Sequence, residues 1–384
     1  MLKLQKLKIG IIGGGQLGKM MTLEAKKMGF YVTVLDPTKN CPSHSISDEH
    51  IIASFDDVNA INELAAKSDV VTYEFEHIDH KALIDLENNG KKIYPTAKSL
   101  KVIQDKLTQK QALVEGGAPV GEFIEVKSID DIIKSGESFG YPFLLKARTG
   151  GYDGKGNYII KSHDEIQIAY ESLGSGKLPL MAERYIDFLM EISVLACRTA
   201  NGETAIYPVG QNHHEDNILL ETKVPASISK ENEEAAMKAA GLVMDIFKGV
   251  GMFCTEMFVL KDGGVLINEV APRPHNSGHY SIEGSVTSQF ENHIRAICGL
   301  PLGDTTLIRP TVMWNILGSN IQNDGKAVVD GMNESLAVQG VKVHVYGKET
   351  SKPQRKMGHL TVTAETLDLA TERAKLAHSL VKIY

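Results

Sequence analysis

Cysteine is scarce in this chain of 384 residues. The four cysteines, Cys41, Cys197, Cys254 and Cys298, lie far apart, and no two have the spacing of a metal-binding or redox pair. This pattern argues against a disulfide framework and a cysteine-ligated zinc site. It favours buried thiols in a protein of the reducing cytoplasm.

Excess positive charge and long apolar runs are missing as well. The chain has 41 Lys and Arg against 48 Asp and Glu, a formal net charge of -7, so it has no general attraction for nucleic acid or an anionic membrane. The sequence shows no signal-peptide core or membrane-spanning run. We therefore expect a cytoplasmic protein with small-molecule ligands and with no nucleic-acid or membrane partner.

The length and an apolar content of 42% fit a protein of two or three domains. Between residues 8 and 94, short apolar runs alternate with helix-like segments at 58–67 and 80–89, a pattern typical of βαβ units and a parallel sheet. Pro95 ends this region. A helix capped by Ser229 is predicted to bury Ala235, Ala239, Leu242, Val243, Ile246, Phe247 and Val250. The last eighty residues predict short strands and a final helix over 367–381.

The stretch "KIGIIGGGQLG" ends an apolar run in a cluster of glycines. Gly13, Gly15 and Gly18 fit the dinucleotide pattern G-x-G-x-x-G, and Asp36 ends the next apolar run, where a ribose-binding carboxylate is expected. The same glycines also suit any strand–turn–helix unit, because a helix N-terminus must approach an anion or the sheet closely. The stretch alone leaves a dinucleotide site, a phosphate turn and a packing turn open.

Two strand-like runs flank Asp262-Gly263, a preferred pair for a two-residue type I′ turn. With that turn as the centre, Glu256 faces Glu269, and two carboxylates opposed across a strand pair repel each other unless something neutralises them. A divalent cation that keeps other positions for water and phosphate would do so, as Mg²⁺ does beside a nucleotide. The alternative is an exposed hairpin with ordinary surface acids.

Phosphates also need cationic and backbone donors. Lys146 interrupts an apolar strand, and the following "GGYDGKG" offers unobstructed N–H groups and Lys155, which predicts a lid over transferring phosphates. It is not a Walker loop. Glu183 and Glu191 stand around another apolar run, where a carboxylate could accept from a ribose hydroxyl or could simply be a solvated acid.

Motifs along nearly the whole chain carry a family resemblance: "GGGQLGKM", "DKLTQK", "KARTGGYDGKGN", "ERYIDFLMEISVL", "NEVAPRPHNSGHY" and "RKMGH". In this order they resemble the ATP-grasp ligases, and in detail they are similar to the 5-(carboxyamino)imidazole ribonucleotide synthase family of purine biosynthesis. The resemblance implies an α/β and α+β multidomain fold. Its parts are a Rossmann-like pre-ATP-grasp domain (1–100), an ATP-grasp domain (101–305) with a mobile flap at about 147–157, and a C-terminal α+β domain (306–384) that completes the substrate site. It also implies a homodimer.

The implied reaction is the ATP- and bicarbonate-dependent carboxylation of 5-aminoimidazole ribonucleotide through carboxyphosphate, with ATP as co-substrate. Mg²⁺, for which Mn²⁺ could substitute, is implied at Glu256 and Glu269. The implied ATP contacts are Lys106, Lys146, Gly151, Gly154, Lys155, Gly156, Glu183, Tyr185, Ile186, Glu191, His214, Asn268 and Glu269. Lys106 departs from the arginine expected in many relatives, so a point charge replaces a planar fork.

For the aminoimidazole ribonucleotide the implied contacts are Gly15, Gln16, Leu17, Glu74, Tyr152, Lys348 and Arg355, with Lys356 nearby. Asp36 then becomes an ordinary acid at a strand end. The residues expected to take part in the chemistry are Lys146, Tyr152, Asp153, Lys155, Arg273, His275 and Asn276. Arg273, His275 and Asn276 are suitable donors for the bicarbonate-derived carboxylate, and Asp153 is the candidate proton acceptor. His275 and His279 could instead be core histidines, and metal ligation by them is not expected.

Three alternatives remain at this stage. One is another ATP-grasp ligase, such as formate-dependent glycinamide ribonucleotide transformylase, although "GGYDGKG" and "RKMGH" favour the carboxylating family. The second is an NAD-dependent dehydrogenase built on the opening glycine motif. The third is a regulatory nucleotide-binding protein, which has no need for Lys146 together with the opposed Glu256 and Glu269.

Overall fold

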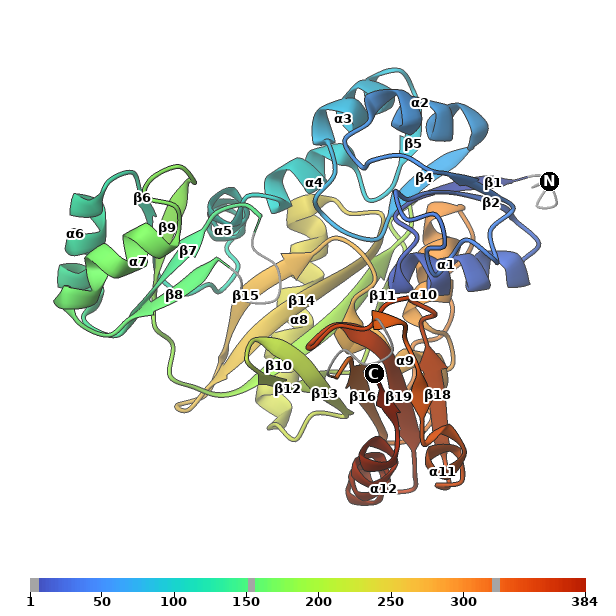
Figure 1. Cartoon of the computed structure of the whole chain (residues 1–384). Coiled ribbons are helices and arrows are strands. Elements are labelled where there is room, and N and C mark those ends of the chain that lie inside the picture. The colour runs from blue at the N-terminus through green and yellow to red at the C-terminus, as the bar shows by residue number, and fades with distance from the viewer. Residues whose placement is uncertain (1–6, 151–155, 320–324) are drawn as a thin grey trace.

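The computed structural model describes residues 7–150, 156–319 and 325–384. The N-terminal part is a five-stranded parallel sheet in the order β3-β2-β1-β4-β5 (Figure 1), which confirms the predicted βαβ alternation. The strands are β1 (Lys8–Ile12), β2 (Tyr31–Leu35), β3 (Glu49–Ile51), β4 (Val70–Tyr73) and β5 (Lys92–Ile93). The helices are α1 (Gln16–Lys27), α2 (Val58–Lys67) and α3 (His80–Asn88).

A second, four-stranded antiparallel sheet has the order β6-β9-β7-β8. Its strands are β6 (Phe123–Val126), β7 (Phe143–Ala147), β8 (Asn157–Ile160) and β9 (Leu180–Arg184). The neighbouring helices are α4 (Ala97–Ile103), α5 (Lys106–Glu115), α6 (Ile129–Phe139) and α7 (Ile166–Ser172), the last preceded by the short turn His163–Glu165. The predicted flap therefore connects the paired strands β7 and β8.

The largest sheet has the order β15-β14-β10-β12-β13-β16-β19-β18, and β11 pairs with β10. Its strands are β10 (Phe188–Arg198), β11 (Thr204–Ile206), β12 (Gly210–Glu215), β13 (Ile218–Val224), β14 (Gly251–Leu260), β15 (Val265–Ala271), β16 (Thr311–Leu317), β18 (Val341–Val345) and β19 (Lys356–Thr363). A short pair, β17 (Val329–Asp330) and β20 (Lys382–Ile383), lies apart from it. The sheet continues across the proposed boundary near residue 305.

Helices cover this sheet and join it to the N-terminal part. They are α8 (Lys230–Phe247), α9 (Ser281–Gly284), α10 (Gln289–Ile297), α11 (Met332–Leu336) and α12 (Leu367–Leu380), with the turn Asn276–Gly278 before α9. Met20 and Met21 of α1 share a hydrophobic cluster with Phe290 and Ile294 of α10. This packing fixes the glycine turn before α1 relative to the large sheet.

Helix α8 begins as predicted, because the Ser229 side chain accepts a hydrogen bond from the backbone of Asn232. Its buried face differs in part from the expected one. The buried residues are Ala236, Ala239, Ala240, Val243, Met244 and Phe247, whereas Ala235, Leu242 and Ile246 are only partly buried and Val250 lies beyond the helix end. The apolar stripe is wider than the sequence spacing indicated.

The four cysteines are free and buried, as predicted. His279 is fully buried and its ring lies 4.6 Å from that of His359, so it is a core histidine. Within residues 7–150, 156–319 and 325–384, no helix is both long and apolar enough to cross a membrane.

Candidate active site

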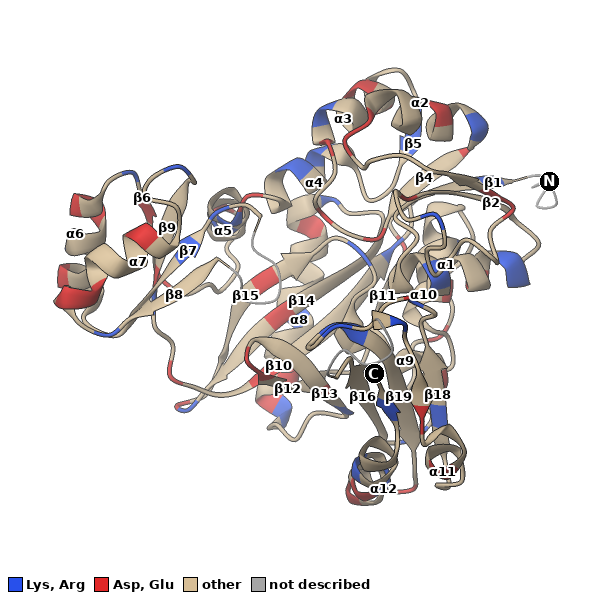
Figure 2. Cartoon of the chain, viewed as in Figure 1, with Lys and Arg blue, Asp and Glu red and all other residues tan. Residues whose placement is uncertain are grey.

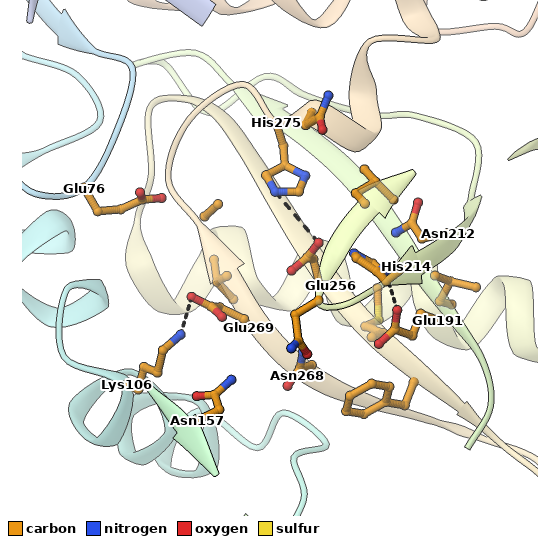
Figure 3. A pocket seen from close by; sticks show the side chains of 18 of the residues that line it. Glu76, Lys106, Asn157, Glu191, Asn212, His214, Glu256, Asn268, Glu269 and His275 are labelled. Carbon is orange, nitrogen blue, oxygen red and sulfur yellow. Dashed lines mark ion pairs between the residues drawn. The ribbon is translucent and has the colours of Figure 1, made fainter. Parts of the chain in front are cut away.

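A cavity of about 600 Å³ lies beside strands β10, β12, β14 and β15 (Figure 3). It brings together many of the residues predicted for ATP, metal and bicarbonate. They are Lys106, Glu191, His214, Glu256, Asn268, Glu269, Arg273, His275 and Asn276. Their elements are separated by long stretches of sequence, so only the fold assembles them.

The turn that connects β14 to β15 differs from the prediction. The backbone N–H of Leu260 donates to the carbonyl of Gly264 at 3.0 Å, which leaves three residues, 261–263, in the loop. A two-residue turn at Asp262-Gly263 is therefore wrong. Gly263 and Gly264 both have a positive φ, 95° and 90°, which explains the double glycine, because that region is costly for other residues.

Glu256 nevertheless stands directly opposite Glu269, as predicted. Figure 2 shows acidic positions on both β14 and β15. A β-bulge restores the register. Met257 pairs with Ile267 and Glu256 with Glu269, so Asn268 is the extra residue of β15. The bulge matters for the site, because side chains of consecutive strand residues normally point to opposite faces. Here Asn268 and Glu269 both line the cavity.

The two acids have different surroundings. Glu269 forms an ion pair with Lys106, with the two charged atoms 2.6 Å apart. Burial alone would raise the pKa of Glu269, but the charge of Lys106 has the larger effect, and the pKa is lowered. For Glu256, burial raises the pKa, the charges of Glu269 and Glu191 add to the rise, and those of His214 and Arg273 oppose it. His275 Nε2 lies 3.8 Å from Glu256, but burial holds the pKa of His275 well below its usual value, so this ring is neutral. Among the described residues, His275 is the one side chain within ion-pair distance of Glu256, and only the more distant His214 and Arg273 offset its charge.

Two opposed carboxylates and the neighbouring amide of Asn268 are hard oxygen donors, the type that Mg²⁺ prefers. A divalent cation would neutralise the facing charges of Glu256 and Glu269. The residues present therefore fit a nucleotide-associated Mg²⁺ at Glu256 and Glu269. Among the described residues there is no cluster of three or more His, Cys, Asp or Glu that could enclose a metal by itself, so water and phosphate would complete the coordination.

On β10 and β12, Glu191 and His214 lie within ion-pair distance of each other. Burial alone would lower the pKa of His214, but the adjacent carboxylate of Glu191 has the larger effect, and the pKa of His214 is raised. The pair therefore presents a held imidazole and a carboxylate at the wall of the cavity (Figure 3).

Lys146, Glu183, Tyr185 and Ile186 do not line this cavity in the described structure. Lys146 on β7 turns to Glu183 on β9, with its Nζ 2.7 Å from Glu183 Oε2. Tyr185 is 42% exposed. The charge of Lys146 still acts on the cavity, because it helps to lower the pKa of Glu269.

Within "DKLTQK", the sequence predicts a role in the site for Lys106 alone. In the structure, Asp105 caps α5 and binds Arg148, a cavity residue, through both oxygens. The buried Gln109 donates to and accepts from the backbone of Val270, next to Glu269. The sequence did contain a signal for these roles: a helix with a weak apolar face carries polar residues at 105, 106, 109 and 110.

A second cavity, of about 590 Å³, lies at the glycine turn. Of the residues predicted for the ribonucleotide, its lining includes Gly15, Gln16, Leu17, Glu74, Lys348 and Arg355. His77, Arg273, His275, Asn276 and Lys356 line both cavities. The two cavities therefore meet at the "RPHN" segment.

The glycine turn itself is occupied by carboxylates of the protein. The N–H groups of Gly15 and Gly18, at the start of α1, donate to Glu74 at 2.6 and 2.7 Å. These are the amides that a dinucleotide pyrophosphate would need. Asp36 is not an ordinary strand-end acid, because it is buried and accepts from the N–H of Gly14 at 2.8 Å. It fixes the turn.

Arg273 is held by a residue that the sequence reasoning missed. Its Nε lies 2.8 Å from Glu76 Oε1 and its second nitrogen 3.2 Å from Glu76 Oε2, a two-point contact that orients the guanidinium. On the ribonucleotide side, Lys348 donates to the carbonyl of Lys356 at 2.7 Å, and Arg355 donates to that of Thr350 at 2.7 Å. The basic loop is thus held by its own backbone.

The predicted flap is described at its two ends, up to Gly150 and from Gly156. Gly151, Tyr152, Asp153, Gly154 and Lys155 lie outside the described residues, so their roles stay predictions. Gly156 is described, has a φ of 103°, and its carbonyl accepts from the N–H of Ala147 at 2.8 Å.

Comparison with known proteins adds three family matches. The ribonucleotide synthetase preATP-grasp domain matches residues 6–104, the ATP-grasp domain matches residues 111–290, and the phosphoribosylaminoimidazole carboxylase C-terminal domain matches residues 311–373. These matches agree with the mixed α/β architecture described above.

Similar proteins cover nearly the whole chain. The N5-carboxyaminoimidazole ribonucleotide synthase of Bacillus subtilis (strain 168) is 42% identical over 361 residues, which span 94% of this chain and 92% of that protein. The crystal structure of the N5-carboxyaminoimidazole ribonucleotide synthetase from Thermotoga maritima is 45% identical, with a TM-score of 0.89 over 98% of this chain and 99% of that one. The Aspergillus clavatus synthase in complex with ADP and 5-aminoimidazole ribonucleotide is 35% identical, with a TM-score of 0.90 over 98% and 99%.

The sequence motifs, the paired cavities and these whole-length matches lead to one assignment. The chain belongs to the N5-carboxyaminoimidazole ribonucleotide synthase family of ATP-grasp ligases.

Proposed function

We propose that this protein carboxylates the exocyclic amine of 5-aminoimidazole ribonucleotide, using ATP and bicarbonate, and so makes N5-carboxyaminoimidazole ribonucleotide for purine biosynthesis. The observation that carries this proposal is the meeting of two cavities at Arg273, His275 and Asn276. One cavity has the acid pair of a metal–nucleotide site, and the other has the glycine turn and basic loop of a ribonucleotide site.

In the first cavity, ATP lies against Lys106, the Glu191–His214 pair and the Asn268–Glu269 bulge. Mg²⁺ held by Glu256 and Glu269 would supply positive charge to the phosphates. A bicarbonate oxygen attacks the γ-phosphorus, the bond to the β-phosphate oxygen breaks, and ADP and carboxyphosphate result. Lys106, which lines this cavity, stabilises the negative charge of the transferring group, and Lys146 adds its charge when it turns from Glu183 to the phosphates.

In the second step the amine of the ribonucleotide attacks the carboxyl carbon, or CO₂ released from it, and inorganic phosphate leaves. Arg273, oriented by Glu76, holds the carboxylate, and Asn276 donates to it. His275 is neutral because burial lowers its pKa, and its Nδ1 lies 2.9 Å from the hydroxyl of Ser277, so its orientation is fixed. Asp153 is proposed to accept the proton of the amine, with Tyr152 beside it.

The ribonucleotide is proposed to bind with its phosphate at Lys348 and Arg355 and its remaining part at Gln16, Leu17 and Glu74. The carboxylate of Glu74 is already bound to the turn, so it offers acceptor lone pairs to ribose hydroxyls without moving. A labile intermediate formed in the first cavity then has a short protected route to the amine, because both cavities share lining residues.

Several further properties are proposed with this function. They are a homodimer, a cytoplasmic location, the use of Mg²⁺, and the division of the chain into domains 1–100, 101–305 and 306–384. Sedimentation velocity at micromolar concentration tests the dimer, and replacement of Mg²⁺ by chelation or by Mn²⁺ in the assay tests the metal.

The experiment for the function is ADP release by the purified protein with Mg²⁺-ATP and bicarbonate, with and without aminoimidazole ribonucleotide. A parallel reaction contains glycinamide ribonucleotide and formate. Stimulation by the aminoimidazole alone, together with an acid-labile carboxylated product, is expected. Stimulation only by the parallel pair would keep the fold and change the substrate, and no stimulation in either reaction would contradict the proposal.

A further inference from the structure

A buried chain of charges lies beside the first cavity. Lys110 of α5, Glu183 of β9 and Lys146 of β7 are all nearly inaccessible, with side chains 5%, 10% and 12% exposed. Glu183 receives Lys146 on one carboxylate oxygen at 2.7 Å and Lys110 on the other at 3.2 Å. The contact of Lys110 is an ion pair without the alignment of a hydrogen bond.

Lys110 does not contact either cavity: it is 4% exposed and is absent from both linings. Glu183 is the one carboxylate within ion-pair distance of Lys110 in the described part of the chain. Burying a third charge next to an already matched pair is unfavourable, because each ion loses its water. Burial indeed lowers the pKa of Lys110. A pair of Lys146 and Glu183 alone would have been the cheaper arrangement.

The unfavourable burial of Lys110 can be explained by the function of Lys146. A lysine matched by one carboxylate presents no net charge to a nucleotide, and its Nζ is held toward that carboxylate. With two cations and one anion, the group has a net charge of +1, and Glu183 divides its attraction between two lysines. Lys146 can then turn to a phosphate while Glu183 remains paired.

We propose that Lys110 is a positioning residue for ATP binding: it compensates Glu183, so that Lys146 remains available, as a net positive charge, to the ATP phosphates. This inference rests on the ATP site of the proposed function. It does not depend on which ribonucleotide is carboxylated.

The test is the affinity for Mg²⁺-ADP and Mg²⁺-ATP, measured by titration calorimetry on the full chain. Lys110→Met keeps the length and apolar stem of the side chain and removes the charge. The dissociation constant of each nucleotide is expected to rise about tenfold, the ratio that one charge-assisted contact supports. The KM for ATP rises in parallel, whereas the KM for bicarbonate does not change.

A second variant separates charge compensation from a purely structural role. Lys110→Arg keeps a positive charge beside Glu183, so its nucleotide affinity is expected to stay near the wild-type value, whereas that of Lys110→Met falls. The matched control is Lys134→Met on α6, whose side chain is 72% exposed and which should bind nucleotide normally. Thermal unfolding confirms that each variant is folded.

Unchanged nucleotide affinity in folded Lys110→Met would overturn the inference. So would a folded Lys110→Arg that binds nucleotide as weakly as Lys110→Met does, because the positive charge would then not be what supports nucleotide binding. If Lys110→Met does not fold, Lys110→Gln replaces it in the same titration, with the same expected loss of nucleotide affinity. A wild-type protein that binds Mg²⁺-ADP but does not carboxylate the ribonucleotide would contradict the proposed function and leave this inference intact.

Discussion

Because Glu256 faces Glu269, we expect Glu256→Gln to be more stable than the wild type without metal and less stable than the wild type with Mg²⁺-ADP bound. In the metal-free protein Glu256 is a partly buried carboxylate, 24% exposed, that faces a second carboxylate. Glu256→Gln removes that repulsion and keeps the shape of the side chain. A like-charge pair across two strands costs up to about 1 kcal/mol, so the metal-free variant is expected to be more stable by about this amount, or about 2 °C in Tm.

The sign of its pH dependence follows from the raised pKa of Glu256. A carboxyl group with a raised pKa contributes stability that is fully present below its unfolded pKa and is lost as the pH rises through its folded pKa. The wild type therefore loses stability relative to Glu256→Gln as the pH rises to neutrality. The difference in Tm between the two proteins should be largest near pH 7 and should narrow in mild acid.

Binding of Mg²⁺-ADP is expected to reverse the order of stability of the wild type and Glu256→Gln. At a Mg²⁺-ADP concentration of 100 times the dissociation constant, the wild type gains about 2.7 kcal/mol. Losing one of two carboxylate ligands should weaken binding at least tenfold, which removes about 1.4 kcal/mol of that gain. Differential scanning fluorimetry with EDTA and with Mg²⁺-ADP measures both states. Glu215→Gln on β12, with a side chain 67% exposed, is the control and should shift neither Tm.

The reasoning would be refuted if Glu256→Gln were less stable than the wild type in both conditions. That result would mean that the carboxylate is a structural acceptor rather than a metal ligand. An unchanged response to Mg²⁺-ADP would equally remove Glu256 from the metal site.

Three further predictions concern the neighbouring contacts. Gly18→Ala would place a Cβ 2.3 Å from the carbonyl oxygen of Gly13 and should cost about 1–3 kcal/mol in stability, measured by urea unfolding; an unchanged midpoint would contradict this close packing. Glu76→Gln should raise the KM for bicarbonate about tenfold by loosening Arg273, and steady-state kinetics in which only the KM for ATP changes would refute it. Burial alone would raise the pKa of Glu183, but Lys146 and Lys110 lower it to about 2. The ionised carboxylate therefore contributes about 3 kcal/mol to stability, which is present above its unfolded pKa and is lost as the pH falls through about 2. The difference in Tm between the wild type and Glu183→Gln should shrink in acid, and a constant difference would contradict this prediction.

The sequence predicted the regular parts of the fold well because their signals are local. The helix over 58–67 has the predicted bounds in the structure, and the parallel sheet follows from the alternation of apolar runs and helices. The site could be predicted only in part. The facing of Glu256 and Glu269 was predicted from a two-residue turn that does not exist, and the pair forms because a three-residue loop and a bulge at Asn268 cancel in register.

The bulge at Asn268 could not be predicted from a sequence pattern, because it is stabilised by tertiary contacts. Gln109 of α5 holds the backbone of Val270 through two hydrogen bonds, one residue beyond Glu269. The irregular strand is thus fixed by a helix that lies about 160 residues earlier in the chain, a separation at which sequence spacing carries no information. The same holds for Glu76 and Arg273, which lie 197 residues apart.

The glycine motif shows why a short pattern can match and still not specify its usual ligand. The turn has the geometry that the pattern predicts: a strand, a tight turn with Gly13 at a φ of 103°, and a helix whose first N–H groups point to an anion. What differs is the source of the anion. Glu74, which directly follows β4, supplies a carboxylate to the N–H groups of Gly15 and Gly18. Burial raises the pKa of Glu74, and these two amides oppose that rise. A pyrophosphate would have to displace a carboxylate of the protein itself, whereas a ribonucleotide that brings hydroxyl donors can use the carboxylate where it stands. The decisive residue for the ligand of this turn therefore lies outside the motif, on the neighbouring strand.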